Sequence, residues 1–399
     1  MKRVLIIDPI FRGSRLFYTQ MAAALGEDVT ILSRTDARTE ASEQAFAEKP
    51  VDLREVVTTS ADSWYYHLSL AQMEELGVAV DQVLANDLFD LIFMAGLDEI
   101  ASGIAAILKR NAGKLAQTSV IAIHYNPSLA AREKIRNIPV PKPLRRFLPS
   151  GPFARISQEF ERLRQHGIPG LRIGLLDEDI FDRVRTRKLF ILQPDPPPPS
   201  LPPSGEDYAL AQSPGGTPNL LLVGRQSRRK GFDDIRRLLE LKSESLPPGC
   251  RMVLCGQLEA ETEHHRAFIV SSAPDLLHID EYLSDQQIRA RYEAADFVIL
   301  PYTTDFRGSS GVLVSAAAAG TPVISTDHGV IGSRVARHGL GYTYPSGDID
   351  RLAEIMRSLP MPDSPVYAEF QKRCRDYAER NSIQAFRTKL EDTIGQNHA

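Results

Sequence analysis

Short apolar runs alternate with helical patterns along the first half of the chain. Runs rich in β-branched residues predict buried strands at residues 4–8, 29–32, 91–95 and 120–124. Between the first two runs, Phe17, Met21 and Leu25 recur at helical spacing, and a second helical pattern covers residues 100–109. Because the strands are continuously apolar, both faces of their sheet must be covered, as in parallel sheets. The pattern therefore predicts a Rossmann-like α/β domain at residues 1–193.

A proline-rich segment separates this pattern from a second one. Seven of the ten residues from Pro194 to Pro203 are proline, and polyproline stays extended and enters neither helices nor central strands. We interpret residues 194–218 as a linker; the alternative is a surface loop inside one large domain. The second pattern predicts strands at residues 220–223, 252–255, 297–300 and 322–325 and helices at 285–295 and 311–319. The pattern thus predicts another parallel α/β domain at residues 219–366 and two consecutive helices at residues 367–399.

The composition is that of an ordinary soluble protein with about two domains. The chain has 399 residues, 43% of them hydrophobic and 25% charged, which disfavours a disordered or fibrous chain. Its net charge of −4 provides no electrostatic reason to expect nucleic-acid binding. Three cysteines form no CxxC pair, which favours a reducing compartment and disfavours a zinc or iron–sulfur site. The first apolar run is too short for a secretory signal, and no uncharged apolar run approaches ~18 residues, so we expect a cytoplasmic protein without membrane spans.

Two loops of the second half carry candidate anion-binding chemistry. The first, residues 223–231, follows a strand, opens a helix and carries four cations. Arg225 and Lys230 on such a loop suit a diphosphate, whereas a lone basic loop of this kind is more often a solvated turn. The second, residues 302–311, is rich in small residues that let backbone N–H groups approach a phosphate at a helix start. Two such loops on one sheet favour a phosphate site.

The order of these motifs resembles GT-B glycosyltransferases, most closely the retaining enzymes of family 4. The motifs are VGR…KG at 223–231, a strand ending in Gly256, AADFVILP at 294–301, AAAAGTPVI at 316–324, and DHG at 327–329. The resemblance implies two Rossmann-like domains facing a central cleft, with a UDP- or GDP-sugar donor held mainly by the C-terminal domain. It also implies an acceptor held mainly by the N-terminal domain, a terminal helix that crosses back to that domain, sugar transfer with retention, and no bound metal.

The resemblance assigns roles to individual residues. Arg225 and Lys230 match the family's pair of cations on the donor diphosphate, and His124 matches the active-site histidine near the sugar. A lone histidine at a strand end is also commonly structural; we expect its ring to emerge where the sheet ends. The expected donor-binding residues are Gly13, Gly224, Arg225, Lys230, Gly256, Gly308, Ser309, Ser310, Gly311 and Ser315.

One departure from the family pattern affects catalysis. The family's E-x7-E glutamates would stand at residues 307 and 315, where this sequence has Arg307 and Ser315. We predict that Arg307 faces the donor pocket and contacts phosphate or an acidic sugar or acceptor, and Asp305 is a candidate replacement carboxylate. The candidate catalytic residues are His124, Asp305 and Arg307. The alternatives are a non-catalytic GT-B binding module that has lost the glutamates, and a nucleotide-sugar epimerase.

Three further signals are weaker. The acidic run Asp177–Asp179 is typical of a solvated turn, and the pair His264 and His265 lacks a third metal ligand at suitable spacing, which favours a surface pair. Residues 134–164 mix basic and apolar side chains in the domain expected to hold the acceptor. Such a stretch fits anionic lipid head groups at the inner face of a membrane, an anionic glycan, or a basic excursion from the sheet. Glycan, lipid-linked and small-molecule acceptors all stay open.

Overall fold

The computed structural model describes residues 2–8, 14–34, 46, 51–56, 70–97, 101–124, 152–197, 218–241, 243–272, 276–281, 283–306 and 308–398. The chain divides into two compact units. The first comprises Met1–Pro194 together with Ile383–Ala399, and the second comprises Asp195–Ser382. Most of the expected linker, residues 194–218, lies outside the described residues, and Asp195 at its start is buried.

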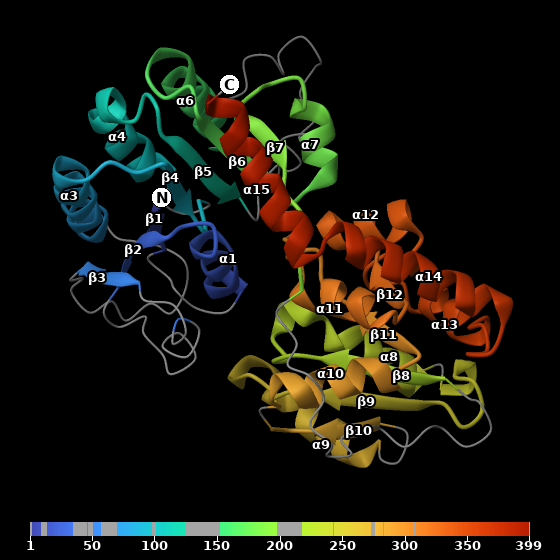
Figure 1. The fold of residues 1–399 in the computed structure, drawn as a ribbon. Helices are drawn as coiled ribbons and strands as arrows, with labels where there is room; N and C mark the ends of the chain where they lie inside the picture. Colours follow the sequence, from blue (N-terminus) through green and yellow to red (C-terminus); the bar gives the residue numbers. More distant parts are fainter. Residues whose placement is uncertain are drawn as a thin grey trace, which may run out of the picture. The chain divides into compact units, whose positions relative to one another are not determined.

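The first unit is built on a seven-stranded parallel sheet with the order β3-β2-β1-β4-β5-β6-β7 (Figure 1). The strands are β1 Arg3–Ile7, β2 Asp28–Arg34, β3 Asp52–Val56, β4 Leu91–Met94, β5 Ser119–His124, β6 Leu171–Leu175 and β7 Phe190–Leu192. The helices are α1 Ser14–Ala23, α3 Leu70–Asn86, α4 Ala101–Asn111, α6 Pro152–His166, α7 Glu178–Val184 and α15 Ile383–His398. The four strands expected from the apolar runs are all present.

The second unit contains a six-stranded parallel sheet with the order β10-β9-β8-β11-β12-β13. Its strands are β8 Asn219–Val223, β9 Arg251–Cys255, β10 Leu276–Ile279, β11 Phe297–Leu300, β12 Val323–Thr326 and β13 Gly341–Tyr344. Its α-helices are α8 Phe232–Leu241, α9 Arg266–Ser271, α10 Asp285–Ala294, α11 Gly311–Ala319, α12 Gly329–His338, α13 Ile349–Arg357 and α14 Pro365–Arg380. The predicted fold class, two α/β units with parallel sheets, is confirmed.

Each sheet buries both of its faces, as the continuously apolar strands require. In β1, Val4 and Ile6 pack into one core and Leu5 and Ile7 into another, because successive side chains of a strand point to opposite faces. In the second unit, α8 and α13 contribute to the core on one face, and α10, α11, α12 and α14 contribute to the core on the other. The packing thus places the helices on both sides of each sheet and leaves the strand ends to the loops.

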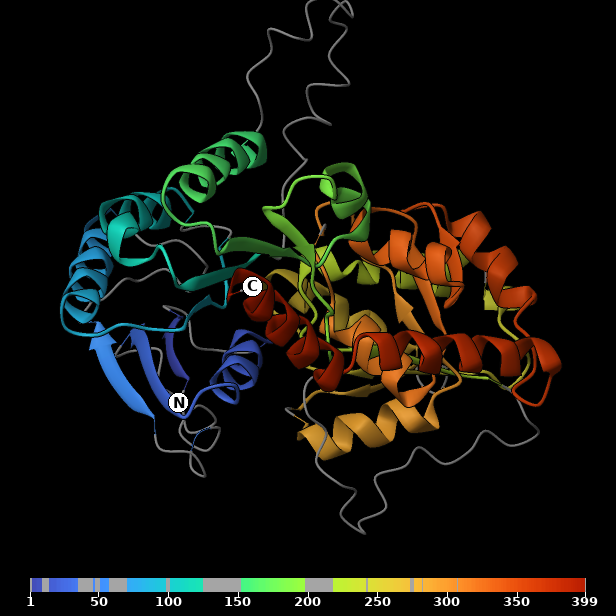
Figure 2. The same cartoon turned by 45° about the horizontal axis from the view of Figure 1, so that its top comes forward.

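Helix α15 belongs to the first unit although it follows the second unit in sequence. It lies against α1 and β5 (Figure 2). The Phe386 ring is fully buried, with its centroid 5.2 Å from that of Tyr18 and 6.5 Å from that of Phe93. Near the end of the helix, the Asn397 amide donates to Ser119 Oγ at 3.0 Å. The spacing of Phe386, Leu390 and Ile394 explains this packing, since positions four apart share one helix face.

A buried ion pair secures the start of the second unit. Arg334 Nη1 of α12 lies 2.6 Å from Asp195 Oδ2, and the two side chains are only 3% and 7% exposed. The backbone N–H of Asp195 also donates to Asn381 Oδ1 at 3.0 Å. Asp195 is therefore held by both α12 and the residue that follows α14, so the second unit begins well before the predicted domain start at residue 219.

Truncating Phe386 tests whether α15 is an integral part of the first unit. Phe386→Ala is expected to lower the free energy of unfolding by ~3–5 kcal/mol, because it leaves a cavity among buried aromatic rings. Urea denaturation followed by circular dichroism measures the change. Glu391→Ala, at an exposed position of the same helix, is the control and should be nearly neutral; equal stability of the two variants would contradict the assignment.

Candidate functional site

Three loops of the second unit begin at the same edge of its sheet. Strands β8, β11 and β12 are neighbours, and each pair runs parallel. Their carboxyl ends therefore meet at one edge, where open α/β sheets bind ligands. The loops that follow are residues 224–231, 301–310 and 327–328.

Glycines shape the basic loop after β8. Gly231 has φ +73°, and a Cβ added there would lie 1.7 Å from the carbonyl oxygen of Pro301. Gly224, with φ +102°, donates its N–H to the Cys255 carbonyl at 2.9 Å. Gly256, with φ +129°, would bring a Cβ to 2.4 Å from the Gly224 carbonyl. The close packing therefore depends on the missing side chains at Gly231 and Gly256, whereas at Gly224 the positive φ favours glycine.

Lys230 connects the basic loop to the loop after β11. Its Nζ donates to the Tyr302 hydroxyl and lies 4.2 Å from the centroid of the Tyr302 ring. The Tyr302 hydroxyl is in turn 3.2 Å from Ser310 Oγ. Tyr302 is only 3% exposed, so its ring is a fixed support for the ammonium group. Among the described residues, this cation is thus held by an aromatic ring and a hydroxyl rather than by a carboxylate.

Helix α11 presents its amino terminus beside this cation. Ser310 is the N-cap residue, and its side chain forms no capping hydrogen bond. The first N–H groups of a helix have no partner within the helix, and the helix dipole is positive at this end. A Cβ added at Gly308 or Gly311 would meet no atom within 4 Å, so the space in front of the helix is open. Lys230 and the α11 terminus together suit a phosphate group.

The other cations of the basic loop extend from it toward solvent or neighbouring side chains. The Arg225 side chain is 67% exposed, with its Nε 3.6 Å from Glu259 Oε1. The Arg229 guanidinium lies 5.3 Å from the centroid of the Phe306 ring. An exposed ion pair contributes little stability, so Arg225 can exchange Glu259 for an anionic ligand at small cost.

The remaining residues predicted for donor binding and catalysis differ in their surroundings. Ser315 hydrogen bonds with Tyr292, whose hydroxyl is buried; that burial raises the pKa of Tyr292. Asp305 is exposed, and Ser309 is half-buried at the open loop. Gly13 and Arg307 lie outside the residues that the structure describes.

In the first unit, two polar side chains lie at the carboxyl edge of the sheet. His124 ends β5 and is 4% exposed, so its ring is more deeply buried than the sequence suggested. Asp8 directly follows β1 and is fully buried, accepting a hydrogen bond from Thr19 Oγ1 at 2.8 Å. We did not single out Asp8 from the sequence; a carboxylate directly after an apolar strand is the signal that identifies it.

Tyr302 and His328 also received no role from the sequence. His328 Nε2 lies 2.7 Å from the carbonyl oxygen of Thr303, which joins the loops after β11 and β12. Both residues stand within two positions of a strand end, and that position is their only sequence signal.

The acidic run and the histidine pair differ in the structure from what the sequence led us to expect. The acidic run at 177–179 starts a helix rather than a simple turn, because Asp177 Oδ1 accepts the N–H of Ile180 at 3.0 Å. The expected surface pair is wrong for His265, which is 2% exposed; burial, followed by the charge of His264, lowers its pKa. His265 Nε2 lies 3.6 Å from Asp233 Oδ1, and Asp233 joins the two histidines in a group whose possible ligand atoms lie within 4.8 Å of one another.

The three cysteines are free and buried. Burial raises the pKa of Cys250 to about 12, of Cys255 to about 11 and of Cys374 to about 12. Because the thiolate is the reactive and metal-binding form, these side chains are poor nucleophiles and poor ligands.

Of the basic segment at residues 134–164, the structure describes only the part in α6, which starts at residue 152. Phe160 and Leu163 of this helix pack into the core of the first unit. Among the described residues, none of the helices combines the length and the apolar character needed to cross a membrane.

Comparison with known proteins finds a family match in the second unit. Residues 217–360 match the family model "Glycosyl transferases group 1". The amylovoran biosynthesis glycosyltransferase AmsK of Erwinia amylovora is 26% identical over 153 residues, and the match covers 37% of each protein. The chain therefore spans less than half the length of this relative.

Solved structures share the fold along the whole chain. The crystal structure of Anabaena Alr3699/HepE in complex with UDP superposes with a TM-score of 0.65 at 14% identity, covering 99% of this chain and 100% of that one. WaaG, a glycosyltransferase involved in lipopolysaccharide biosynthesis, has a TM-score of 0.58 at 17% identity, with 99% of each chain covered. The resemblance to GT-B glycosyltransferases is thus confirmed for the fold, and for residues 217–360 by the family model.

Replacing Gly231 tests whether the basic loop packs closely against Pro301. Gly231→Ala is expected to lower the free energy of unfolding by ~2 kcal/mol or more, because a side chain is strained at this φ and collides with Pro301. Differential scanning calorimetry measures the effect. Gly308→Ala, where a Cβ meets open space, should stay within ~0.5 kcal/mol of the parent protein; a similar loss in both variants would refute the packing argument.

Proposed function

We propose that this chain, which carries a glycosyl transferases group 1 domain in a GT-B fold, is a glycosyltransferase that uses a UDP- or GDP-sugar donor. The observation that carries the proposal is Lys230, held by Tyr302 beside the amino terminus of α11. A diphosphate carries its negative charge on several oxygen atoms, and a fixed ammonium group beside free backbone N–H groups suits such a group.

The same groups account for catalysis of sugar transfer. When the bond between the sugar and the diphosphate breaks, negative charge grows on the departing phosphate oxygens. Lys230, Arg225 and the N–H groups at the start of α11 would stabilise that charge, and groups positioned before the reaction need no reorganisation during it. These residues supply positive charge without a metal ion, so we propose that transfer requires none.

Relatives support the donor class. Crystal structures of Anabaena Alr3699/HepE contain UDP, and UDP with glucose. AmsK is described as a glycosyltransferase of amylovoran biosynthesis. For this chain we propose a UDP-sugar as the first donor to test and a glycan, lipid-linked or small-molecule acceptor, with transfer in the retaining sense.

Polar groups of the first unit are candidates for contact with the sugar or the acceptor. His124 and Asp8 lie at the carboxyl edge of its sheet, at the ends of β5 and β1. An imidazole and a carboxylate at such an edge can hydrogen bond with sugar hydroxyl groups. We propose that His124 orients the transferred sugar, and that Asp305 and Arg307 act from the donor side.

Ser315 favours a second candidate function, a non-catalytic nucleotide-sugar-binding module. The family pattern places a glutamate at this position, but here the side chain is a hydroxyl that hydrogen bonds with Tyr292. A module of this kind would bind the donor through Lys230 and transfer no sugar. A nucleotide-sugar epimerase is a third candidate. It would isomerise the donor in the absence of an acceptor, which neither of the other two candidates would do.

Removing both donor-site cations tests the proposed phosphate contacts. Arg225→Ala combined with Lys230→Ala should weaken UDP binding by several kcal/mol, since each charge-assisted contact contributes ~1.5–3 kcal/mol. Isothermal titration calorimetry with UDP and GDP measures the affinity. Arg251→Ala is the matched control, because Arg251 is an exposed arginine at the amino end of β9 on the same sheet. Unchanged UDP affinity in the double variant would remove the donor-site assignment.

Replacing His124 separates the enzyme from the binding module. His124→Asn keeps a polar group at the strand end, and we expect it to lower kcat while UDP affinity changes little, because the sugar contact matters mainly in the transition state. Turnover of a panel of UDP- and GDP-sugars measures kcat, and thermal unfolding checks that the variant is folded. Full activity in a folded variant would exclude the orienting role, and absence of turnover by the parent protein would favour the module.

A further inference from the structure

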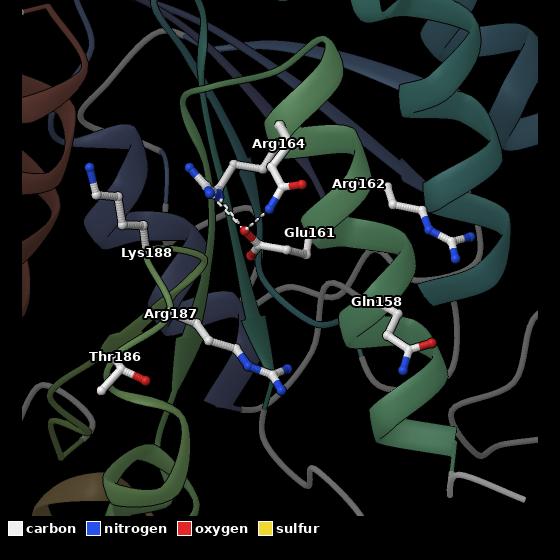
Figure 3. A pocket seen from close by; sticks show the side chains of 8 residues that line it. Gln158, Glu161, Arg162, Arg164, Thr186, Arg187 and Lys188 are labelled. Carbon is white, nitrogen blue, oxygen red and sulfur yellow. Dashed lines mark hydrogen bonds and ion pairs between the residues drawn. The ribbon is translucent and has the colours of Figure 1, made fainter.

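A basic pocket lies in the first unit between α6 and the turn that joins α7 to β7 (Figure 3). Its volume is about 480 Å³. Its charged lining consists of Glu161, Arg162 and Arg164 from α6 and Arg187 and Lys188 from the turn. Four cations thus share the pocket with a single carboxylate.

Among the described residues, Glu161 forms an ion pair with only one of these cations. Arg164 Nη2 lies 2.6 Å from Glu161 Oε1, and the Gln165 amide donates to the same oxygen at 3.0 Å. Burial alone would raise the pKa of Glu161, but hydrogen bonds from Arg164 and Gln165, together with the charges of Arg164 and Arg187, lower it. The carboxylate is therefore ionised, and its Oε1 is occupied by α6 itself.

The other three cations leave the pocket with a positive charge. Arg162, Arg187 and Lys188 are exposed, and within the described part of the chain none lies at ion-pair distance from a carboxylate. Arg172 is a further cation near the pocket. Its guanidinium donates to the Pro169 and Leu171 carbonyls and to Asn397 Oδ1, which are neutral acceptors, so these contacts bring no negative charge to the pocket. Burial lowers the pKa of Arg172, and the positive charge of Arg164 lowers it further. An anion in the pocket would relieve this repulsion.

The donor groups fit a phosphate monoester. Guanidinium groups bind phosphate oxygens with two parallel hydrogen bonds, and a lysine adds a point charge. Thr186 adds a hydroxyl to the same lining. In addition, Glu161 Oε2 is a buried acceptor without a hydrogen-bond partner. Because a buried ionised oxygen requires a donor, it favours a ligand that carries a hydroxyl group next to its phosphate.

The pocket lies at the amino edge of the first unit's sheet. Arg164 and Gln165 belong to the last turn of α6, shortly before β6 starts at residue 171, and Lys188 precedes β7, which starts at residue 190. His124, by contrast, is the last residue of β5, and β5 pairs with β6 in parallel. The pocket and His124 therefore lie at opposite edges of one sheet, and the pocket does not overlap the edge assigned to the sugar.

We propose that this pocket is a separate binding site for a phosphate monoester that bears hydroxyl groups. The same chemistry occurs in a soluble phosphorylated polyol and in a phosphomonoester lipid head group. The site does not depend on the proposed transferase activity, since its groups belong to the first unit and its binding can be measured without turnover.

Charge removal at the turn tests the site. Glycerol 3-phosphate is the soluble probe, and its binding is followed by phosphorus NMR titration. Phosphatidylcholine vesicles with or without phosphatidylinositol 4-phosphate, whose phosphomonoester lies next to free hydroxyl groups, are the lipid probe, and their binding is followed by co-sedimentation. Arg187→Ser combined with Lys188→Ser should weaken binding at least about tenfold, because two charge-assisted contacts are lost. The Glu161–Arg164 pair stays intact in this variant, so the fold of α6 is kept.

Two controls show whether probe binding depends on the pocket itself, on the positive charge of the surrounding surface, or on the donor site. Arg183→Ser combined with Arg185→Ser removes the same charge from exposed neighbouring positions outside the lining, and this variant should bind like the parent protein. Lys230→Ala should also bind normally, so failure of the donor assignment leaves this result unaffected.

The two probes distinguish a soluble ligand from a lipid head group. Pocket-dependent binding of glycerol 3-phosphate supports a soluble ligand, and pocket-dependent binding of phosphatidylinositol 4-phosphate vesicles alone supports a lipid head group. The proposal would be overturned if the variant changed at Arg187 and Lys188 and the variant changed at Arg183 and Arg185 lost the same probe affinity. It would also be overturned if the parent protein showed no saturable binding of either probe.

Discussion

Parallel pairing of β8 with its neighbours determines where every polar group of the candidate donor site lies. Because β8, β11 and β12 run in the same direction, the chain leaves each strand at the same edge. Three loops that are far apart in sequence are thereby brought within hydrogen-bond distance, as the contact between Lys230 and Tyr302 and that between His328 and Thr303 demonstrate. Reversing one strand would send its loop to the opposite edge of the sheet.

Close backbone packing makes this edge rigid. Gly231 and Gly256 lie against the backbone of neighbouring strand ends, where a Cβ would collide with a carbonyl oxygen. Rigidity matters because electrostatic stabilisation of a leaving group depends on positive groups that are already in position. The Tyr302 ring provides a similar advantage, since it positions the Lys230 ammonium without neutralising its charge.

The net charge of the chain conceals two local excesses of positive charge. The chain carries a formal charge of −4, yet cations collect at the carboxyl edge of the second sheet and at the amino edge of the first. Charges on a protein surface act over roughly 8 Å at physiological ionic strength, so a ligand responds to the local arrangement rather than to the sum. In both clusters the cations lie on turns or helix ends next to strands, where side chains extend from the sheet without disturbing its core.

The apolar runs of the sequence determined the fold class and the two parallel sheets, and the short basic motif predicted the candidate anion-binding loop. Their periodicity reports burial directly, and Arg225 and Lys230 belong to a short motif whose residues are neighbours in sequence. The tertiary structure alone decided which side chains meet. Tyr302 supports a lysine 72 positions away, and the basic pocket combines α6 with the turn before β7. Such contacts depend on strand order and register, which bring together residues that no local pattern relates.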